Sequence, residues 1–249
     1  MVGNNISLGQ HWLKNRAILD EIAELAGEGK LCVEIGPGLG FLTSSLLKRF
    51  DKVVAVEFDK RLAENLPKSF PGKNLKVVNE DILKYDLSQM EGQYSVAGNI
   101  PYYITSPIIE KLLTAEKIPD IIVLLIQKEV AERIANNKET VLSLFVKNRA
   151  EVELGPVVLK AEFTPPSKVD SQVIVLRPFK DGPVYSEELF KIIKLGFIAP
   201  RKKLIHNLAA IKSHDELVRI FEELGISQDA RPADLHIDDY NSLFNKMVI

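Results

Sequence analysis

The chain has 249 residues, of which 46% are hydrophobic and 27% charged, and its formal net charge is −2 at pH 7. These values match ordinary globular proteins, so they exclude a disordered, collagen-like or disulfide-stapled chain. At about 150 residues per domain, the length predicts one full domain and a smaller companion. The near-zero charge means that contact with a polyanion would need a local basic patch.

The apolar stretches and the single cysteine predict a protein of a reducing, non-membrane compartment. The longest apolar stretch, 118–126, is interrupted by Pro119 and Asp120 and is shorter than the roughly 18 residues of a membrane span. The N-terminus lacks the cationic and apolar pattern of a signal peptide. Cys32 lies in an apolar run, where a buried inert thiol is more typical than a catalytic one. We therefore expect a cytoplasmic protein without membrane contact.

Strand-like and helix-like segments alternate over the first half of the chain. A helix capped by Asn15 comes first, and the strand-like runs then follow at 31–35, 53–56, 75–78, 94–98 and 121–126. Strands that are apolar on both faces and separated by helices are typical of a parallel sheet covered on both sides. The pattern predicts a doubly wound, Rossmann-like α/β sheet.

The pattern changes after Gln127. Two β-rich stretches, 152–159 and 173–176, have no helix between them, so we expect them to form an antiparallel edge of the sheet. From Ser186 onward only helical segments follow, and Ser213 and Glu216 have the spacing of a capping box. We therefore place an α/β domain at 1–182 and a small helical domain at 183–249.

Three glycines, Gly36, Gly38 and Gly40, follow the first predicted strand. Glycines at a strand end let a ligand approach the backbone where a helix N-terminus faces it. The spacing is G-x-G-x-G, and Phe41 occupies the position of the last glycine in the dinucleotide fingerprint G-x-G-x-x-G. The motif therefore indicates a ligand-binding turn but disfavours NAD.

Two acids follow the next two strands. Glu57 could accept hydrogen bonds from the hydroxyls of a ribose, and Asp81 could accept one from an adenine amino group. Each acid taken singly is more typical of a helix cap or a solvated strand end. Together with the glycines, at carboxyl ends of successive strands, they favour a nucleoside site.

The most specific motif is Asn99-Ile100-Pro101-Tyr102, at the end of the fourth strand. An amide oxygen and a backbone carbonyl are neutral acceptors that can hold an exocyclic amino group, and proline fixes the torsion that aims the aromatic ring. Two acceptors holding the hydrogens of an adenine N6 would direct its lone pair towards an electrophile. An isolated tetrapeptide of this kind is more often an ordinary turn.

Several motifs follow one another along nearly the whole chain: Leu8-Gly9-Gln10-His11-Trp12-Leu13, the glycine turn, Glu57, Asp81, Asn99-Ile100-Pro101-Tyr102, and Phe163 to Ser171. This order resembles the rRNA adenine N6-dimethyltransferases. Residues 103–107, 127–131 and 201–204 are similar to the bacterial small-subunit enzyme of that family. The resemblance implies that S-adenosylmethionine is the methyl donor, that S-adenosylhomocysteine is the product, and that two adjacent adenosines near the 3′ end of 16S rRNA are the targets.

The resemblance also implies roles for individual residues. Those that would bind S-adenosylmethionine are His11, Leu13, Gly36, Gly38, Glu57, Asp81 and Asn99. Those that would hold the target base are Asn99, Ile100, Pro101, Tyr102 and Phe163, the last two by stacking. Outside the family match, an aromatic such as Phe163 is more often a core residue, and Trp12 is expected to pack.

The expected partner is 16S rRNA within the small ribosomal subunit, bound by a monomer. Arg201, Lys202 and Lys203 form the one compact basic run and would contact phosphates from the helical domain. A sulfonium donor needs alignment rather than a strong base, so no catalytic His or Cys and no metal is expected. The histidines in the helical region, His206, His214 and His236, lack metal-like spacing.

The chain departs from the family pattern at three places. Leu8 replaces a usual aromatic residue, the Tyr-Gly that commonly precedes Leu-Ser is missing from 136–144, and Ser167 replaces the third proline of its loop. Two alternatives therefore stay open: a large-subunit rRNA adenine methyltransferase of the macrolide-resistance type, and a ribosome-assembly factor without turnover. A nicotinamide-dependent oxidoreductase is a more distant third.

Overall fold

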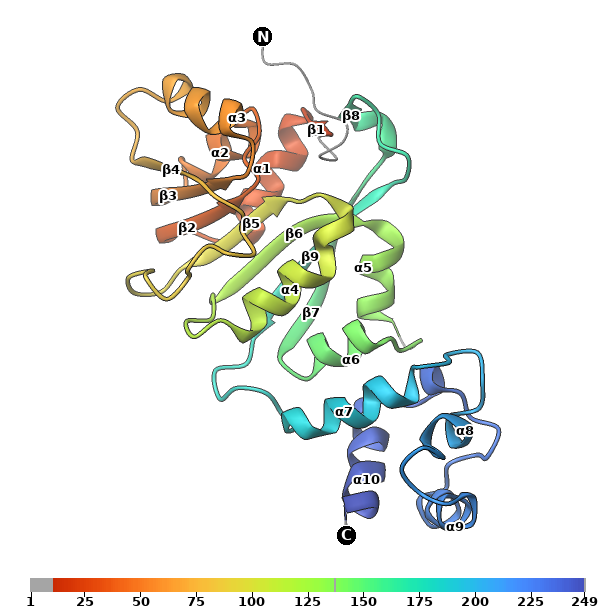
Figure 1. Cartoon of the computed structure of the whole chain (residues 1–249). Coiled ribbons are helices and arrows are strands. Elements are labelled where there is room, and N and C mark those ends of the chain that lie inside the picture. The colour runs from red at the N-terminus through yellow and green to blue at the C-terminus, as the bar shows by residue number, and fades with distance from the viewer. Residues whose placement is uncertain (1–10, 137, 249) are drawn as a thin grey trace. The chain divides into compact units, whose positions relative to one another are not determined.

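A computed structural model describes residues 11–136 and 138–248 (Figure 1), so Leu8 lies outside the described residues. The chain divides into two compact units, each treated by itself. The first runs up to Ala131 and includes Glu151–Pro178, and the second comprises Glu132–Ala150 and Phe179–Ile249. Residues 132–150, which the sequence prediction placed in the first domain, belong to the helical unit because Leu144 packs into its core.

The first unit is built on a seven-stranded sheet of order β4-β3-β2-β5-β6-β9-β7. Its first five strands in chain order are parallel and β9 runs antiparallel to β6, which confirms the predicted Rossmann-like fold with an antiparallel edge. The strands are β2 (Gly29–Ile35), β3 (Phe50–Glu57), β4 (Leu75–Asn79), β5 (Ser95–Asn99), β6 (Ile121–Gln127), β7 (Ala150–Val158) and β9 (Ser171–Pro178).

The central strands are buried on both faces, and their sequences show why. Residues 31–35 of β2 and 122–126 of β6 are all buried, so neither strand has a polar face for solvent. Near-continuous apolar runs of this kind are what a parallel sheet between two helical layers requires. The same property explains why these strands could be predicted from the sequence.

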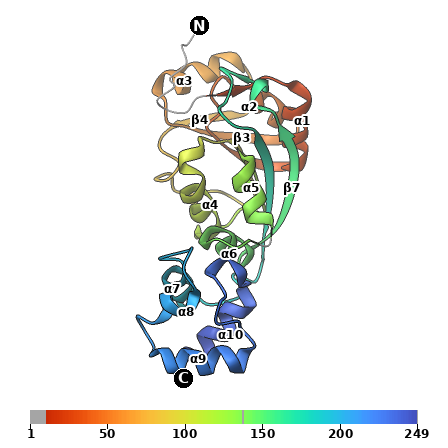
Figure 2. The same ribbon diagram turned by 90° about the vertical axis from the view of Figure 1, so that its right-hand side faces the viewer.

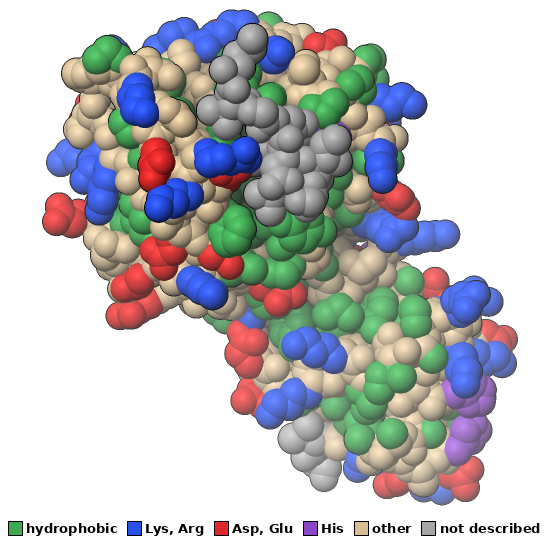
Figure 3. Space-filling model, turned by 45° about the horizontal axis from the view of Figure 1, so that its top comes forward, with side chains coloured by type: hydrophobic (Ala, Val, Ile, Leu, Met, Phe, Trp, Pro, Cys, Tyr) green, Lys and Arg blue, Asp and Glu red, His purple; other side chains and the backbone are tan. Residues whose placement is uncertain are grey.

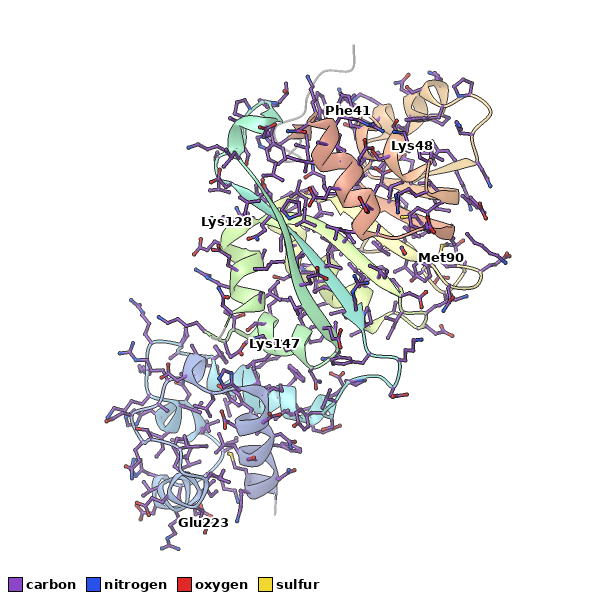
Figure 4. The ribbon with its side chains drawn as sticks, turned by 180° about the vertical axis from the view of Figure 1, so that it is seen from behind. Phe41, Lys48, Met90, Lys128, Lys147 and Glu223 are labelled. Atoms are coloured by element: carbon purple, nitrogen blue, oxygen red, sulfur yellow. The ribbon has the colours of Figure 1, made fainter. Side chains whose placement is uncertain are left out.

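Helices cover both faces of the sheet. Side chains of α1 and α2 share one apolar cluster with Cys32, Val53 and Val123 of the sheet, and α4 lies over the opposite face (Figures 1 and 4). Asn15 caps the first of these helices, accepting from the Ile18 amide at 3.4 Å. The helices that begin in this unit are α1 (Arg16–Leu25), α2 (Phe41–Leu46), α3 (Lys60–Asn65), α4 (Thr105–Thr114) and α5 (Lys128–Ala135).

A short two-stranded sheet brings the start of the described chain to a distant loop. In it β1 (Trp12–Leu13) pairs antiparallel with β8 (Phe163–Thr164), with Trp12 opposite Thr164 and Leu13 opposite Phe163. The two strands lie side by side at the top of Figure 1. Each has two residues, too short for a periodic signal, so the sequence did not predict them.

The second unit consists of helices around an apolar core of its own (Figure 2). The predicted capping box is confirmed: Ser213 accepts from the Glu216 amide at 3.4 Å, and Glu216 accepts from the Ser213 amide at 3.1 Å. Its α-helices are α6 (Val141–Lys147), α7 (Glu187–Gly196), α8 (Leu204–Leu208), α9 (His214–Leu224) and α10 (Ile237–Val248). Short 3-10 helices in the chain are η2 (Leu66–Ser69), η3 (Tyr102–Ile104), η4 (Lys160–Glu162) and η5 (Pro232–Asp234).

Within the described residues, no helix combines the length and the apolar character that a membrane crossing requires.

We expect Gly40→Ala to destabilise the protein more than Gly72→Ala. Both glycines have positive φ, 85° and 71°, so each substitution carries a conformational cost of about 1 kcal/mol. A Cβ at Gly40 would also lie 2.7 Å from Leu66 Cδ1 and from Phe70 Cε2, whereas at Gly72 nothing lies within 4 Å. This overlap adds about 1–3 kcal/mol. Urea unfolding of both variants measures the difference, and equal losses would contradict the crowding.

Candidate active site

A cavity of about 500 Å³ opens at the carboxyl ends of β2, β3 and β5. This is the position at which open α/β sheets bind ligands. On the larger unit, Figure 3 shows a group of hydrophobic side chains with charged side chains around it. The predicted residues that line the cavity are His11, Leu13, Gly36, Gly38, Glu57, Asp81, Asn99, Ile100, Pro101 and Tyr102.

The glycine turn is tied to the acid that follows the next strand. The Gly38 amide donates to Glu57 Oε2 at 3.0 Å, and the Asp59 amide donates to Glu57 Oε1 at 2.8 Å. Gly36 and Gly38 have φ of 64° and 57°, and a Cβ at Gly38 would lie 3.2 Å from Trp12 Nε1. Trp12 therefore packs against the turn, and the positive φ together with this close contact favours glycine at position 38.

The Glu57 carboxylate is buried yet held by amide donors. Burial raises the pKa of Glu57, and the hydrogen bonds from the Asp59 and Gly38 amides act in the opposite direction. A carboxylate offers about four lone pairs, so the Gly38 and Asp59 amides leave it able to accept from a ligand as well. The side chain can thus accept a hydrogen bond from a hydroxyl group in the cavity.

Asp81 lies two residues beyond the end of β4. Its Oδ1 accepts from the Leu83 amide at 2.9 Å, while Oδ2 has no hydrogen-bond partner in the part of the chain that the structure describes. The end of β4 is itself attached to β3, because Asn79 donates to the Glu57 carbonyl oxygen at 2.9 Å. This attachment holds Asp81 and Glu57 on one wall of the cavity.

Asn99 is oriented by a main-chain acceptor. Its Nδ2 donates to the carbonyl oxygen of His11 at 3.0 Å, which identifies the nitrogen side of the amide and leaves Oδ1 as a free acceptor. His11 is anchored in turn, because its Nδ1 donates to the Pro165 carbonyl oxygen at 2.9 Å. The amide of Asn99, at the end of β5, is therefore presented with its acceptor oxygen unpaired.

The Tyr102 hydroxyl is fully engaged by two serines. It shares hydrogen bonds with Ser167 Oγ at 3.0 Å and with Ser171 Oγ at 2.7 Å. Both serines are buried, Ser171 completely. Pro101, with φ of −61°, sets the turn that leads into the ring. Tyr102 thus offers the cavity its ring rather than its hydroxyl, and Ser167 is one of the positions where the chain departs from the family pattern.

The structure does not bring Phe163 to the cavity. Phe163 is 2% exposed and packs in the apolar core with Leu13, its partner across the β1–β8 pair. Successive side chains of a strand alternate in direction, and the inward position here belongs to Phe163 while Thr164 is exposed. The expected stacking of Phe163 on a base therefore has no support in this arrangement, and Phe163 shapes the site through packing.

Glu34 is a cavity residue that the sequence prediction missed. It is 1% exposed, and its Oε2 has no hydrogen-bond partner among the described groups. Burial raises its pKa to about 8, opposed by the neighbouring Thr43 and assisted by the charge of Glu57. The sequence feature that could have identified it is an acid inside an apolar strand, two residues before Gly36.

The basic run lies in the helical unit. Lys203 Nζ forms an ion pair with Asp229 Oδ1 at 2.5 Å, whereas Arg201 and Lys202 are exposed without a described partner. The rings of His206 and His214 stack with centroids 6.4 Å apart. Across 11–136 and 138–248, no group of three His, Cys, Asp or Glu side chains is arranged to hold a metal ion.

The cavity thus combines acceptors suited to a nucleoside with a second, neutral acceptor next to an aromatic ring. The acids Glu57 and Asp81 follow β3 and β4, whereas Asn99 and Tyr102 lie at and after the end of β5, on the other side of β2 in the sheet order. None of these contacts activates a nucleophile. The arrangement suits a reaction that depends on alignment of two bound molecules.

Comparisons of sequence agree with this chemistry. The family model described as "Ribosomal RNA adenine dimethylase" matches residues 1–248. A protein of Nostoc sp. named "Ribosomal RNA small subunit methyltransferase A" is 40% identical over 257 residues, which cover 95% of each chain. A protein of the same name from Fusobacterium nucleatum is 37% identical over 94% of each chain.

Comparisons of structure find the same architecture in related enzymes. A dimethyladenosine transferase from Plasmodium falciparum matches with a TM-score of 0.80 and 28% identity, covering 96% of this chain and 99% of the other. The 23S rRNA methyltransferase ErmE matches with a TM-score of 0.77 and 26% identity, covering 96% and 100%. The match therefore extends over both units of the chain.

We expect Glu34→Gln to flatten the pH dependence of stability. With a folded pKa of about 8 and an ordinary value of 4.5, the folded protein holds one extra proton between these pH values. The stabilisation from Glu34 is complete below pH 4.5 and is lost as pH rises through 8. The loss in unfolding free energy between pH 5 and pH 9 should shrink by about 4 kcal/mol, measured by urea titration.

The exposed Glu91→Gln serves as the matched control for Glu34→Gln, since it makes the same chemical change away from the cavity. We expect its pH dependence to follow the wild type. If both variants lose stability with pH as the wild type does, Glu34 is not the buried acid responsible.

Proposed function

Because this chain belongs to the ribosomal RNA adenine dimethylase family, we propose that it transfers methyl groups from S-adenosylmethionine to N6 of two adjacent adenosines. The proposed targets lie in the 3′-terminal hairpin of 16S rRNA, and the product is N6,N6-dimethyladenosine. The names of the curated relatives support the small subunit as the substrate. The reaction would take place in the cytoplasm, where the subunit matures, and the enzyme would act as a monomer.

The observation that carries this proposal is the orientation of Asn99. Its amide nitrogen is committed to the His11 carbonyl at 3.0 Å, so its oxygen can accept a hydrogen of an adenine N6. The Ile100 carbonyl would accept the second hydrogen. Two neutral acceptors favour a pyramidal amino nitrogen whose lone pair points at the electrophile, and they leave the base uncharged.

The cavity also fits the proposed methyl donor. Gly36 and Gly38 form a cradle that a side chain would fill. In this proposal Glu57 accepts from the ribose hydroxyls and Asp81 from the adenine amino group, and the unpaired Glu34 Oε2 is a further acceptor in the same cavity. His11 and Leu13 would line the methionine end. When bound, S-adenosylmethionine supplies a methyl group on a sulfonium leaving group.

Tyr102 would supply the surface for the extruded base. A base that leaves the RNA stack loses stacking energy, and an aromatic platform returns about 1–3 kcal/mol. The two serine contacts hold the Tyr102 ring in one orientation, so little side-chain entropy is lost when the base arrives. Pro101 contributes through the fixed torsion before the ring.

Two other functions motivated by the sequence are less well supported. The macrolide-resistance type acts on the large subunit, and its structural relative ErmE is 26% identical, against 37–40% for relatives named for the small subunit. An assembly factor without turnover would have no need for the oriented Asn99 acceptor. Mapping of the methylated nucleotide distinguishes the large-subunit activity from the proposed one. An absence of methyl incorporation would favour the assembly factor.

We expect Asn99→Ala to lower the rate of methyl transfer by about 10²–10³-fold, as for loss of one preorganised polar contact in an active site. Binding of S-adenosylmethionine should stay largely intact. The measurement is tritiated-methyl incorporation into undermethylated small subunits, followed by nucleotide mapping. Asn74→Ala is the matched control, because it removes a comparable amide-to-carbonyl bond, to Asp51 at 2.9 Å, away from the cavity. An Asn99→Ala variant as active as this control would refute the role of Asn99.

We expect phosphate contacts from Arg201 and Lys202. Replacing both with Ala should weaken binding to the rRNA and reduce the slope of log K against log salt by about 1–2, because each phosphate contact releases counterions. Adding Lys203→Ala should change the slope little, since Lys203 already pairs with Asp229. The exposed pair Lys52→Ala and Lys76→Ala gives a charge-matched control. If no variant alters the slope of log K against log salt, the basic run does not contact the RNA.

A further inference from the structure

Two exposed side chains stand at the rim of the cavity, each next to an anchored residue. Tyr103 follows Tyr102, and Lys168 follows Ser167. The hydrogen bond between Tyr102 and Ser167, 3.0 Å long, joins η3 to the loop before β9. Both Tyr103 and Lys168 line the cavity. The same anchor therefore brings an aromatic ring and a cation to one rim, which we call the rim subsite.

The exposure of Tyr103 is unusual for a tyrosine of this protein. Its side chain is 67% exposed, and its hydroxyl has no hydrogen-bond partner among the described residues. Tyr94 and Tyr240 are buried instead, and their hydroxyls donate to the carbonyl oxygens of Lys117 at 2.6 Å and Pro232 at 2.9 Å. Tyr103 shares the cavity lining with two other exposed apolar side chains, Phe58 at 63% and Val169 at 41%. Exposed apolar side chains grouped in this way beside a cavity are typical of a binding surface.

Lys168 adds a positive charge that the protein does not neutralise. It is exposed and forms no ion pair within the described part of the chain. Other lysines do have carboxylate partners, such as Lys147 with Glu139 and Lys246 with Glu223, both at 2.7 Å. The Lys168 ammonium is therefore available to an anion that reaches the rim from solvent.

An aromatic face together with a free cation has the chemistry of a nucleotide-binding surface. Every base presents a π-face to an aromatic ring, and a lysine pairs with the phosphate of the backbone. A free anion would need only the lysine, and an apolar peptide would need only the ring. The occupant that uses both is a single-stranded nucleotide.

We propose that Tyr103 and Lys168 hold the nucleotide adjacent to the target adenosine, with its base stacked on Tyr103 and its phosphate against Lys168. The inference rests on the proposed function, which places the target base beside Tyr102. Tyr102 and Tyr103 are consecutive residues facing the cavity and its rim, and consecutive nucleotides are joined by one phosphate. When either of the two adjacent adenosines enters the cavity, the other occupies the rim subsite.

The test compares three hairpin RNAs with wild type, Tyr103→Ala and Tyr103→Phe. One RNA carries both adenosines, and the other two each carry an abasic residue in place of one of them. For Tyr103→Ala we expect kcat/KM on the intact hairpin to fall by about 5- to 150-fold, the range of one base–aromatic stack. Tyr103→Phe should stay near wild type because its ring still stacks.

The abasic RNAs give the readout that a structural role would not move. In at least one of them, where the missing base is the one that stacks, wild-type kcat/KM should fall by a factor similar to the Tyr103→Ala effect. On that RNA, kcat/KM of Tyr103→Ala should equal that of the wild type. If Tyr103→Ala is as sensitive to both abasic RNAs as the wild type is, the rim subsite is refuted. Thermal unfolding checks that the variants are folded.

Lys168→Ala tests the phosphate contact, with Lys168→Arg as the conservative variant and Lys52→Ala as the control at the amino end of the sheet. We expect Lys168→Ala to raise KM and weaken its salt dependence, Lys168→Arg to restore both, and Lys52→Ala to change neither. Unchanged KM and salt dependence in Lys168→Ala would overturn the contact.

The two proposals fail in different ways. A wild-type protein that methylates neither the intact hairpin nor undermethylated small subunits would overturn the proposed function. In that case the rim subsite is tested by binding instead of activity. Fluorescence anisotropy gives the affinities of wild type and Tyr103→Ala for the three hairpins, and the intact and abasic RNAs are compared as above. If the wild type is active and Tyr103→Ala discriminates between intact and abasic hairpins as the wild type does, only the rim subsite is overturned.

Discussion

The site depends on one hydrogen-bonded seam, in which His11 joins the end of β5 to the loop after β8. Its carbonyl oxygen accepts from Asn99 and its ring donates to the Pro165 carbonyl, at 3.0 and 2.9 Å. A free amide side chain can turn its oxygen or its nitrogen to a ligand at nearly equal energy. The seam removes that freedom, because only the nitrogen can face a carbonyl oxygen. The acceptor of Asn99 is thus set before any ligand arrives.

The same loop orients the aromatic part of the cavity. Ser167 and Ser171 take both hydrogen-bonding directions of the Tyr102 hydroxyl, so the polar end of the ring is fixed inside the protein. Ser167, which stands where the family pattern has proline, supplies one of these contacts. This departure from the pattern therefore contributes to the site. Phe163, opposite Leu13 in the β1–β8 pair, packs into the apolar core and so supports the loop from the core side.

Two buried acids in the cavity lining, Glu34 and Glu57, destabilise the fold. Glu34 and Glu57 are 1% and 6% exposed, and burial raises the pKa of both. Glu57 recovers part of that cost through two amide donors. Glu34 has one oxygen without a partner, which is a destabilising arrangement in the absence of ligand. Unsatisfied polar groups of this kind concentrate where a protein binds something.

The sequence by itself determined the architecture and most of the cavity lining. Five apolar runs bounded by turns predicted the parallel strands, and residues at their carboxyl ends must meet at one edge of a sheet. It did not determine β1 and β8, which are too short for periodicity, nor the placement of residues 132–150. Only the tertiary structure decided that Phe163 is buried while Tyr103 is exposed. An aromatic side chain suits a core and a binding surface equally well, and the choice depends on which neighbours cover it.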